Sequence, residues 1–180
     1  ERNITIESDK SSDDKIKELI RTDDKTEIKI GTNYVINTSD LIYFRLKKIL
    51  KSDNKTSLID NFNNKAETNG FEYDAENKKF KSKDLKIIDK DLNKYITKNS
   101  LVDLNNNQIA AKDVEMYFSK KANFGENARL KGNYMISDNN ETLIQKGVFT
   151  TCKPNDDCPP WAMQSGSIKH DKKKKIIEYK

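Results

Sequence analysis

The 180-residue sequence is poor in the residue types that most often build catalytic and metal sites. His170 is its one histidine and lies in Lys169–Lys172, a stretch typical of a solvent-exposed turn. The 6 glycines are scattered, without the spacing of a phosphate-binding loop. A paired-carboxylate glycosidase site could draw its acids from anywhere in the chain, but the acidic residues fall in turns or opposite lysines. We therefore expect a protein that is not an enzyme and that holds no metal or cofactor.

Proline and long apolar runs are also scarce. The 3 prolines begin only at Pro154, so no internal linker is evident and residues 1–180 are predicted to form one domain. No apolar run approaches the roughly 20 residues of a membrane-spanning helix. The chain begins at Glu1 without a signal-type apolar segment, which favours a processed or excised piece of a longer protein. Apolar residues make up 34%, a proportion that predicts a thin core.

The distribution of charged residues argues against nucleic acid as a partner. The chain has 34 Lys and Arg against 29 Asp and Glu, a net charge of +5, and the two signs are mixed along its whole length. Nucleic-acid-binding domains usually cluster their basic residues. A mild positive balance would instead attract an anionic ligand such as a phosphorylated lipid.

A repeat of alternating residues occupies the middle of the chain. Phe80–Ile87, Tyr95–Val102 and Ile109–Met116 each place apolar or small residues at every second position, with one double step in the middle. Alternation is typical of strands, and the double step predicts a bulge or bend. Asp- and Asn-rich clusters between the segments predict turns. The sequence therefore predicts an all-β antiparallel meander of about a dozen strands or more, stacked as two facing sheets.

Further strands are predicted towards the N-terminus. They are Ile4–Ile6, Lys15–Ile20, Glu27–Ile30 and Leu41–Phe44.

The alternation assigns side chains to an inner and an outer face. In the first repeat Phe80, Ser82, Leu85 and Ile87 share one face, and Lys81, Lys83 and Lys86 share the other. The predicted inner apolar residues are Phe80, Leu85, Ile87, Val102, Ile109, Val114 and Met116. Such residues either fill a closed core or line a cleft for acyl chains, and from the residues alone the closed core is favoured.

The C-terminal quarter carries a resemblance to a known family. The runs Ala128–Asn133, Gly147–Cys152, Cys158–Trp161, Ile168–Asp171 and Lys175–Tyr179 follow in this order. They resemble the end of the periplasmic OstA-like domain of the LptD family of outer-membrane lipopolysaccharide-assembly proteins, its alphaproteobacterial members above all. The central repeat, residues 34–118, resembles the OstA repeat of the same transport bridge. The first 30 residues match this pattern least clearly.

The resemblance implies a fold and a role. The fold is an open β-jellyroll whose two sheets splay into a V, at the periplasmic face of the outer membrane of a Gram-negative bacterium. The role is to receive lipopolysaccharide from the bridge protein LptA by β-strand addition, at an N-terminal edge that includes Ile4–Ile6 or Glu27–Ile30. The acyl chains would pass between the sheets, which favours a cleft over a closed core. The phosphates would stay at a positively charged mouth. A C-terminal barrel with the plug lipoprotein LptE would follow residue 180.

The two cysteines suggest a local bridge. Cys152 and Cys158 lie six positions apart with Pro154 between them, so a loop can bring them within disulfide range in an oxidising compartment. Pairing of either sulfur with the barrel in the full protein is the alternative. The family's further cysteine near the N-terminus is missing from the first 151 residues.

Two other functions remain open from the sequence. One is a soluble lipopolysaccharide-bridge protein or another OstA-repeat scaffold, which would lack the segment from Cys152 to Trp161. The other is a carbohydrate-binding β-solenoid, which would need a row of exposed aromatic residues where this chain offers the single Trp161.

Overall fold

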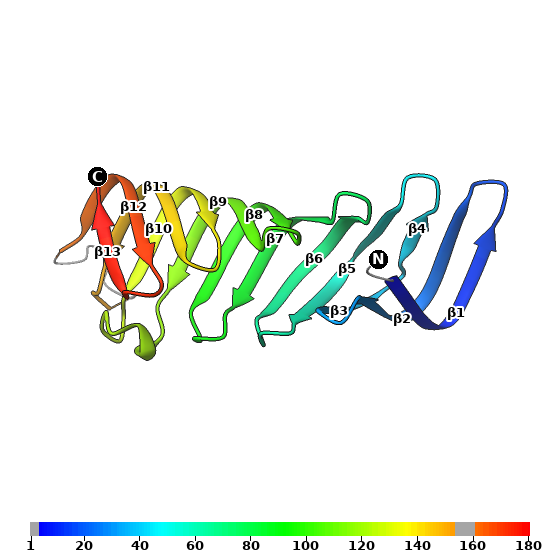
Figure 1. The fold of residues 1–180 in the computed structure, drawn as a ribbon, viewed down its shortest axis with the longest axis horizontal. Coiled ribbons are helices and arrows are strands. Elements are labelled where there is room, and N and C mark those ends of the chain that lie inside the picture. Colours follow the sequence, from blue (N-terminus) through cyan, green and yellow to red (C-terminus); the bar gives the residue numbers. More distant parts are fainter. Residues whose placement is uncertain (1–3, 154–160) are drawn as a thin grey trace.

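The computed structural model describes residues 4–153 and 161–180 as one antiparallel sheet of 13 strands, shown in Figure 1. The strands are β1 (Ile4–Asp14), β2 (Leu19–Ile30), β3 (Tyr34–Ser39), β4 (Ile42–Phe44), β5 (Ile49–Asp60), β6 (Lys65–Asp74), β7 (Lys79–Ile88), β8 (Lys94–Asp103), β9 (Gln108–Tyr117), β10 (Arg129–Ser137), β11 (Glu141–Thr150), β12 (Met163–Asp171) and β13 (Ile176–Tyr179). A 3-10 turn, η1 (Lys120–Ala122), is the one helical element in this part of the chain. The predicted all-β class is confirmed, and the fold is an open antiparallel β-jellyroll.

The meander follows the order of the sequence. Each strand pairs with the strand before and after it, while the short β4 continues the path of β3 and pairs with β2 and β5. Figure 1 shows the result as a long stack with β1 at one end and β13 at the other. The two facing layers predicted from the sequence are therefore the two halves of one continuous sheet rather than two separate sheets.

The strands of the central repeat change their alternation where the sequence has its double step. In β7, Phe80, Ser82, Leu85 and Ile87 are all buried, whereas the predicted outer lysines, Lys81, Lys83 and Lys86, are exposed. The inner and outer faces predicted for this repeat are confirmed.

Residues at the bends take left-handed backbone conformations. Asn99 in β8 and Asp113 in β9 both have φ of 45°, and the pairing of these two strands shifts register close by. In β6 the same position is Gly70, with φ of 98°, and a Cβ there would lie 3.1 Å from the carbonyl oxygen of Ser52. An extra residue at each bend returns the alternation to the same face, as a β-bulge does. Both halves of a strand thus turn their apolar residues inward.

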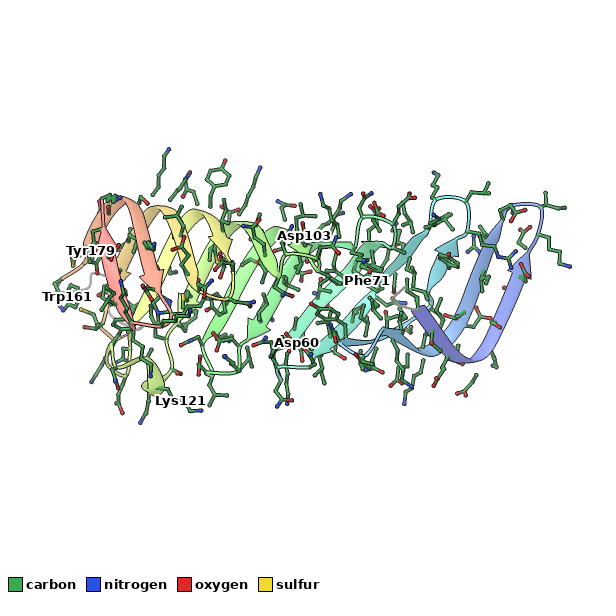
Figure 2. All side chains as sticks on the ribbon, in the orientation of Figure 1. Asp60, Phe71, Asp103, Lys121, Trp161 and Tyr179 are labelled. Atoms are coloured by element: carbon green, nitrogen blue, oxygen red, sulfur yellow. The ribbon has the colours of Figure 1, made fainter. Side chains whose placement is uncertain are left out.

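The turns fall on two edges of the bent sheet. We call the turns at 15–18, 45–48, 75–78, 104–107, 138–140 and 172–175 turn row 1, and those at 31–33, 61–64, 89–93 and 118–128 turn row 2. Figure 2 shows Lys121 of turn row 2, and Asp60 beside that row, along the lower side of the stack, and Asp103, beside turn row 1, on the upper side.

An aspartate at the start of most turns holds the turn closed. Asp74 accepts hydrogen bonds from the backbone N–H groups of Glu76 and Asn77 at 3.0 and 2.9 Å. Asp14 does the same for Ile16 and Lys17, so residues 15–18 form a turn and the predicted strand Lys15–Ile20 is wrong except for its last two residues. The short alternation of apolar residues in 15–20 resembles a strand, but Asp14 directly before it indicates a turn, as the aspartates before other turns do.

Successive turns of one row are joined to each other. The N–H of Leu104 donates to the carbonyl of Lys78 at 3.0 Å in turn row 1. In turn row 2 the N–H of Lys90 donates to Asn64 Oδ1 at 2.8 Å. Such bonds between neighbouring turns keep the repeats in step along the stack.

The core lies between the two halves, with hydroxyl-bearing residues along the bend. Its largest fully buried members are Tyr73, Phe80, Ile28, Ile30, Ile36, Leu41, Leu50, Met116, Leu130, Met135, Ile144 and Ile168. The buried hydroxyls bond within the sheet, as Thr38 does to Thr56 at 2.8 Å and Thr97 to Ser100 at 2.6 Å. None of the helical structure in the described residues is long or apolar enough to cross a bilayer.

Candidate functional site

A cavity of about 150 Å³ lies in the middle of the stack, between the two halves of the sheet. Phe80, Leu85, Ile87, Val102 and Ile109, all predicted from the alternation, line it. Val114 and Met116 do not line it: they are 1% and 0% exposed and belong to the packed core on the C-terminal side. The structure therefore places the first five predicted residues on the cavity and the other two in the adjoining part of the same core.

Both halves of the sheet contribute walls. Phe80 pairs across the strands with Val102, and Val102 pairs with Ile109, on the half next to turn row 1. Ile87 pairs with Tyr95 on the half next to turn row 2. The Phe80 ring also stacks on Phe71, with centroids 5.1 Å apart, and this fixes the orientation of the wall.

Sequence reasoning missed part of the lining. Tyr34, Leu58, Ala66, Tyr95 and Met135 also face the cavity. Tyr95 opens the second repeat at the position that Phe80 and Ile109 occupy in the other two, so the repeat itself held the signal. The others lie in strands whose alternation is less regular.

The cavity opens between the two turn rows. Asp60, Phe62, Asn64 and Asp89 reach it from turn row 2, and Leu104, Asn107, Asp138, Asn139 and Lys172 reach it from turn row 1 or the adjoining strand ends. Phe62 is 56% exposed at this mouth. The lining carries Lys65 and Lys172 against Asp60, Asp89 and Asp138. A mouth of net positive charge, expected from the overall balance, is therefore absent.

The mouth is bridged from row to row. Tyr34 Oη donates to Asn107 Oδ1 at 3.1 Å, although the two residues are far apart in the sequence. Towards the C-terminus, Lys175 Nζ of turn row 1 donates to the carbonyl of Lys121 of turn row 2 at 3.1 Å. The halves of the sheet are thus held together along their open side.

Polar side chains border the cavity on both sides. Tyr95 Oη donates to Asp89 Oδ2 at 3.1 Å, and burial, reinforced by the charge of Asp89, raises the pKa of Tyr95 well above its usual value. Opposite them, Lys172 Nζ donates to Ser137 Oγ at 3.0 Å and to the carbonyl of Asp138. Burial lowers the pKa of Lys172. These groups give an otherwise apolar cavity a polar end.

His170 lies beside this polar end and is not the solvated turn residue that the sequence predicted. It is 3% exposed, and its Nδ1 has no hydrogen-bond partner in the described part of the chain. Its ring meets those of Phe118 and Phe124 edge-on, with centroids 5.1 and 5.7 Å away. Burial lowers the pKa of His170 to about 4, so the ring is neutral near pH 7. The prediction was wrong because β12 continues through Asp171, which turns His170 inward with Ile168.

The connection at 118–128 covers the C-terminal part of the open side. Phe124 packs on Phe118 and Phe149, with ring centroids 4.8 and 6.2 Å away. Ala122 and Ala128, two residues of this connection, are buried. We call residues 118–128 the strap.

The cysteine bridge remains a prediction. Cys152 is buried, and its Sγ lies 3.6 Å from the carbonyl oxygen of Trp161. Cys158 lies outside the described residues.

The ends of the stack carry unpaired strand edges within the described residues. β1 pairs with β2 alone and β13 with β12 alone. Ile4–Ile6 lies on the β1 edge, as one of the two predicted sites of strand addition. Glu27–Ile30, the other, lies inside the sheet between β1 and β3, so that part of the prediction is wrong.

The lining of the cavity therefore suits the binding of an apolar molecule. Within residues 4–153 and 161–180, no group of three His, Cys, Asp or Glu side chains is placed to hold a metal ion. Comparison with known proteins adds no assignment: no family model matches the chain, and no curated protein does so significantly.

Proposed function

We propose that this chain is a periplasmic lipid conduit of the outer-membrane lipopolysaccharide translocon, of the LptD type that its sequence resembles. The observation that carries the proposal is the apolar cavity between the halves of one bent sheet, open along the line between the turn rows. Acyl chains would travel in this interior, each buried CH₂ contributing roughly 0.8 kcal/mol.

The size of the cavity requires the sheet to open. The cavity measures about 150 Å³, which is the size of an engineered protein cavity that binds benzene. It can therefore hold only a short segment of an acyl chain. The hydroxyls along the bend bond within the sheet, so spreading the turn rows leaves those bonds intact. The contacts that must break are those across the mouth, such as Tyr34 to Asn107.

The two ends of the stack supply the rest of the proposal. The edge of β1, 11 residues long, would accept a strand of the bridge protein LptA, since edge N–H and C=O groups are satisfied by strand addition. The β13 end would lead to the C-terminal barrel with its LptE plug.

One further function has an observation in its favour. Because both terminal strands pair on one side only, the stack could be extended at either end, which suits a soluble bridge protein of the same transport system. Such a protein would form head-to-tail chains, and sedimentation velocity over a range of concentrations would detect them. A monomer at all concentrations would favour the translocon domain.

Site-specific photo-crosslinking to purified lipopolysaccharide tests the conduit. Crosslinkers at Leu85 or Ile87, which line the cavity, should capture the lipid. Those at Lys81 or Lys86, on the outer face of the same strand, should not. Equal capture at both pairs would show that lipid does not enter between the halves of the sheet.

A further inference from the structure

We propose that Lys172 is the binding group for the anionic head group of a lipid whose chain occupies the cavity. This inference rests on the proposed function, because it requires an acyl chain between the halves of the sheet. Lys172 borders the cavity together with Ser137, Asp138 and Asn139. It therefore stands where the apolar lining meets the mouth.

The ammonium group of Lys172 has spare hydrogen-bonding capacity. It donates to Ser137 Oγ and to the carbonyl of Asp138, both uncharged acceptors. An ammonium has three N–H donors, so one remains for a ligand. Among the described residues no carboxylate forms an ion pair with Lys172, whereas lysines on the outer face do, as Lys131 does with Glu115 at 2.8 Å. Lys172 is thus a partly buried cation that forms no ion pair with the described residues, although the charges of Asp89 and Asp138 attract it from a longer distance.

The carboxylates at the same cavity are already engaged by their own turns. Asp89 accepts from the N–H groups of Asp91 and Asn93 at 2.9 and 2.8 Å, as well as from Tyr95. Asp138 accepts from the N–H groups that follow it in its turn, at 2.8 and 2.9 Å. These bonds hold the two carboxylates in their turns, and neither forms an ion pair with Lys172, although both attract its charge from a longer distance.

The chemistry of the site defines the class of ligand. An apolar cavity with a few convergent polar groups is typical of sites for amphiphilic small molecules. A lysine ammonium is a compact point charge, so its geometry suits a carboxylate and a phosphate equally. The ligand is therefore an acyl chain that carries one of these anions near the mouth, and a neutral amphiphile of the same length would bind more weakly.

Displacement of the fluorescent apolar probe N-phenyl-1-naphthylamine from the purified chain tests the inference. The competitors are dodecyl phosphate, dodecanoate and dodecanol, which share a chain length and differ in head group. We expect either anion to displace the probe at about tenfold lower concentration than dodecanol, the effect of one charge-assisted hydrogen bond. The phosphate and carboxylate arms show which anion the site prefers, and a preference for either supports the inference.

Three variants make the test specific. Lys172→Met should abolish the difference between the anions and dodecanol, and Lys172→Arg should keep it. Lys173→Met, an exposed neighbour in the same turn, should also keep it. The urea midpoint of each variant shows whether it is folded, and Lys172→Gln replaces Lys172→Met if that variant is not.

The outcomes separate this inference from the function on which it rests. If dodecanol and the anions compete equally and Lys172→Met changes nothing, the head-group site is overturned and an apolar interior still stands. If no amphiphile displaces the probe from the wild-type chain, the lipid-binding interior fails as well. An anion preference that Lys172→Met and Lys173→Met both reduce equally would reflect net charge alone and would also overturn the inference.

Discussion

The hydrogen bond between Tyr34 and Asn107 ties the two turn rows together across the mouth, so removing it should loosen the mouth. Tyr34→Phe deletes one hydroxyl and keeps the ring, which is 9% exposed. Asn107 is exposed, and water replaces the lost partner. A neutral hydrogen bond of this kind contributes about 1 kcal/mol to the free energy of unfolding.

The same loss should strengthen lipid binding. If lipid enters only when the rows separate, a contact present only in the closed form lowers the population that can bind. Removing about 1 kcal/mol from the closed form would raise the apparent affinity for dodecanol about fivefold. Tyr34→Phe is therefore expected to lower stability and raise affinity together.

Urea unfolding and probe displacement measure the two effects on one sample, and Tyr117→Phe is the matched control. Tyr117 Oη donates to Glu115 Oε2 at 2.7 Å, two residues away on its own strand, so its loss affects no contact between the rows. The control should lose stability without gaining affinity. If Tyr34→Phe behaves like the control, entry between the turn rows is refuted.

Three further predictions concern the interior. Gly132→Ala should lower the free energy of unfolding in urea by about 1–3 kcal/mol, because the added Cβ would collide with the side chain of Ile144. The control Gly166→Ala, whose Cβ would have its nearest neighbour 3.7 Å away, should leave the free energy of unfolding almost unchanged. Val102→Phe should fill the cavity, so the chain should stay folded and stop binding dodecanol in the displacement assay. His170 should make the protein less stable in acid, because its folded pKa of about 4 lies below the ordinary histidine value of 6.5. The stability that it contributes is present above pH 6.5 and is lost as the pH falls towards 4. His170→Leu should remove up to about 3 kcal/mol of this dependence, and an unchanged dependence in urea unfolding at pH 7 and pH 4 would contradict the burial argument.

The alternation of the central repeats was enough to predict the strands and their faces. Phe80 is apolar and buried, whereas its neighbour Lys81 is charged and exposed. Because neighbouring residues differ this clearly, the alternation identifies the inner and outer faces of the strand. The double step also marks the bend, because an extra residue is the only way to keep Leu85 on the side of Phe80. Local sequence therefore determined the fold class and the candidate lining.

What the sequence could not indicate depends on contacts between distant segments. Tyr34 and Asn107 meet because the whole sheet bends and twists, which no local pattern encodes. Lys172 begins a run of four lysines, and nothing in that run distinguishes the one that turns to the cavity. His170 looked like part of a turn because charged residues flank it, and only the extent of β12 reveals that it faces inward.

The residues at the bend differ along the stack. In the middle strands the bend is lined by hydroxyls such as Ser82 and Thr97, which form hydrogen bonds within the sheet. On the C-terminal side the bend holds Gly132 and Gly147, and the side chains of Ile144 and Ile168 lie directly over them. These contacts pack the core there, and the strap covers its open side.

This division bears on the path of a lipid. A chain that moved along the axis past β9 would have to part a packed core that includes Met116, Leu130 and Ile144, all 0% exposed. A chain that moved sideways would separate only the two turn rows at the mouth, where Tyr34 and Asn107 form the bridging bond. Since opening the core costs apolar burial while opening the mouth costs contacts of about 1 kcal/mol each, the proposed conduit would take up its lipid through the side. Onward passage to the β13 end would require the packed core beyond β9 to open as well.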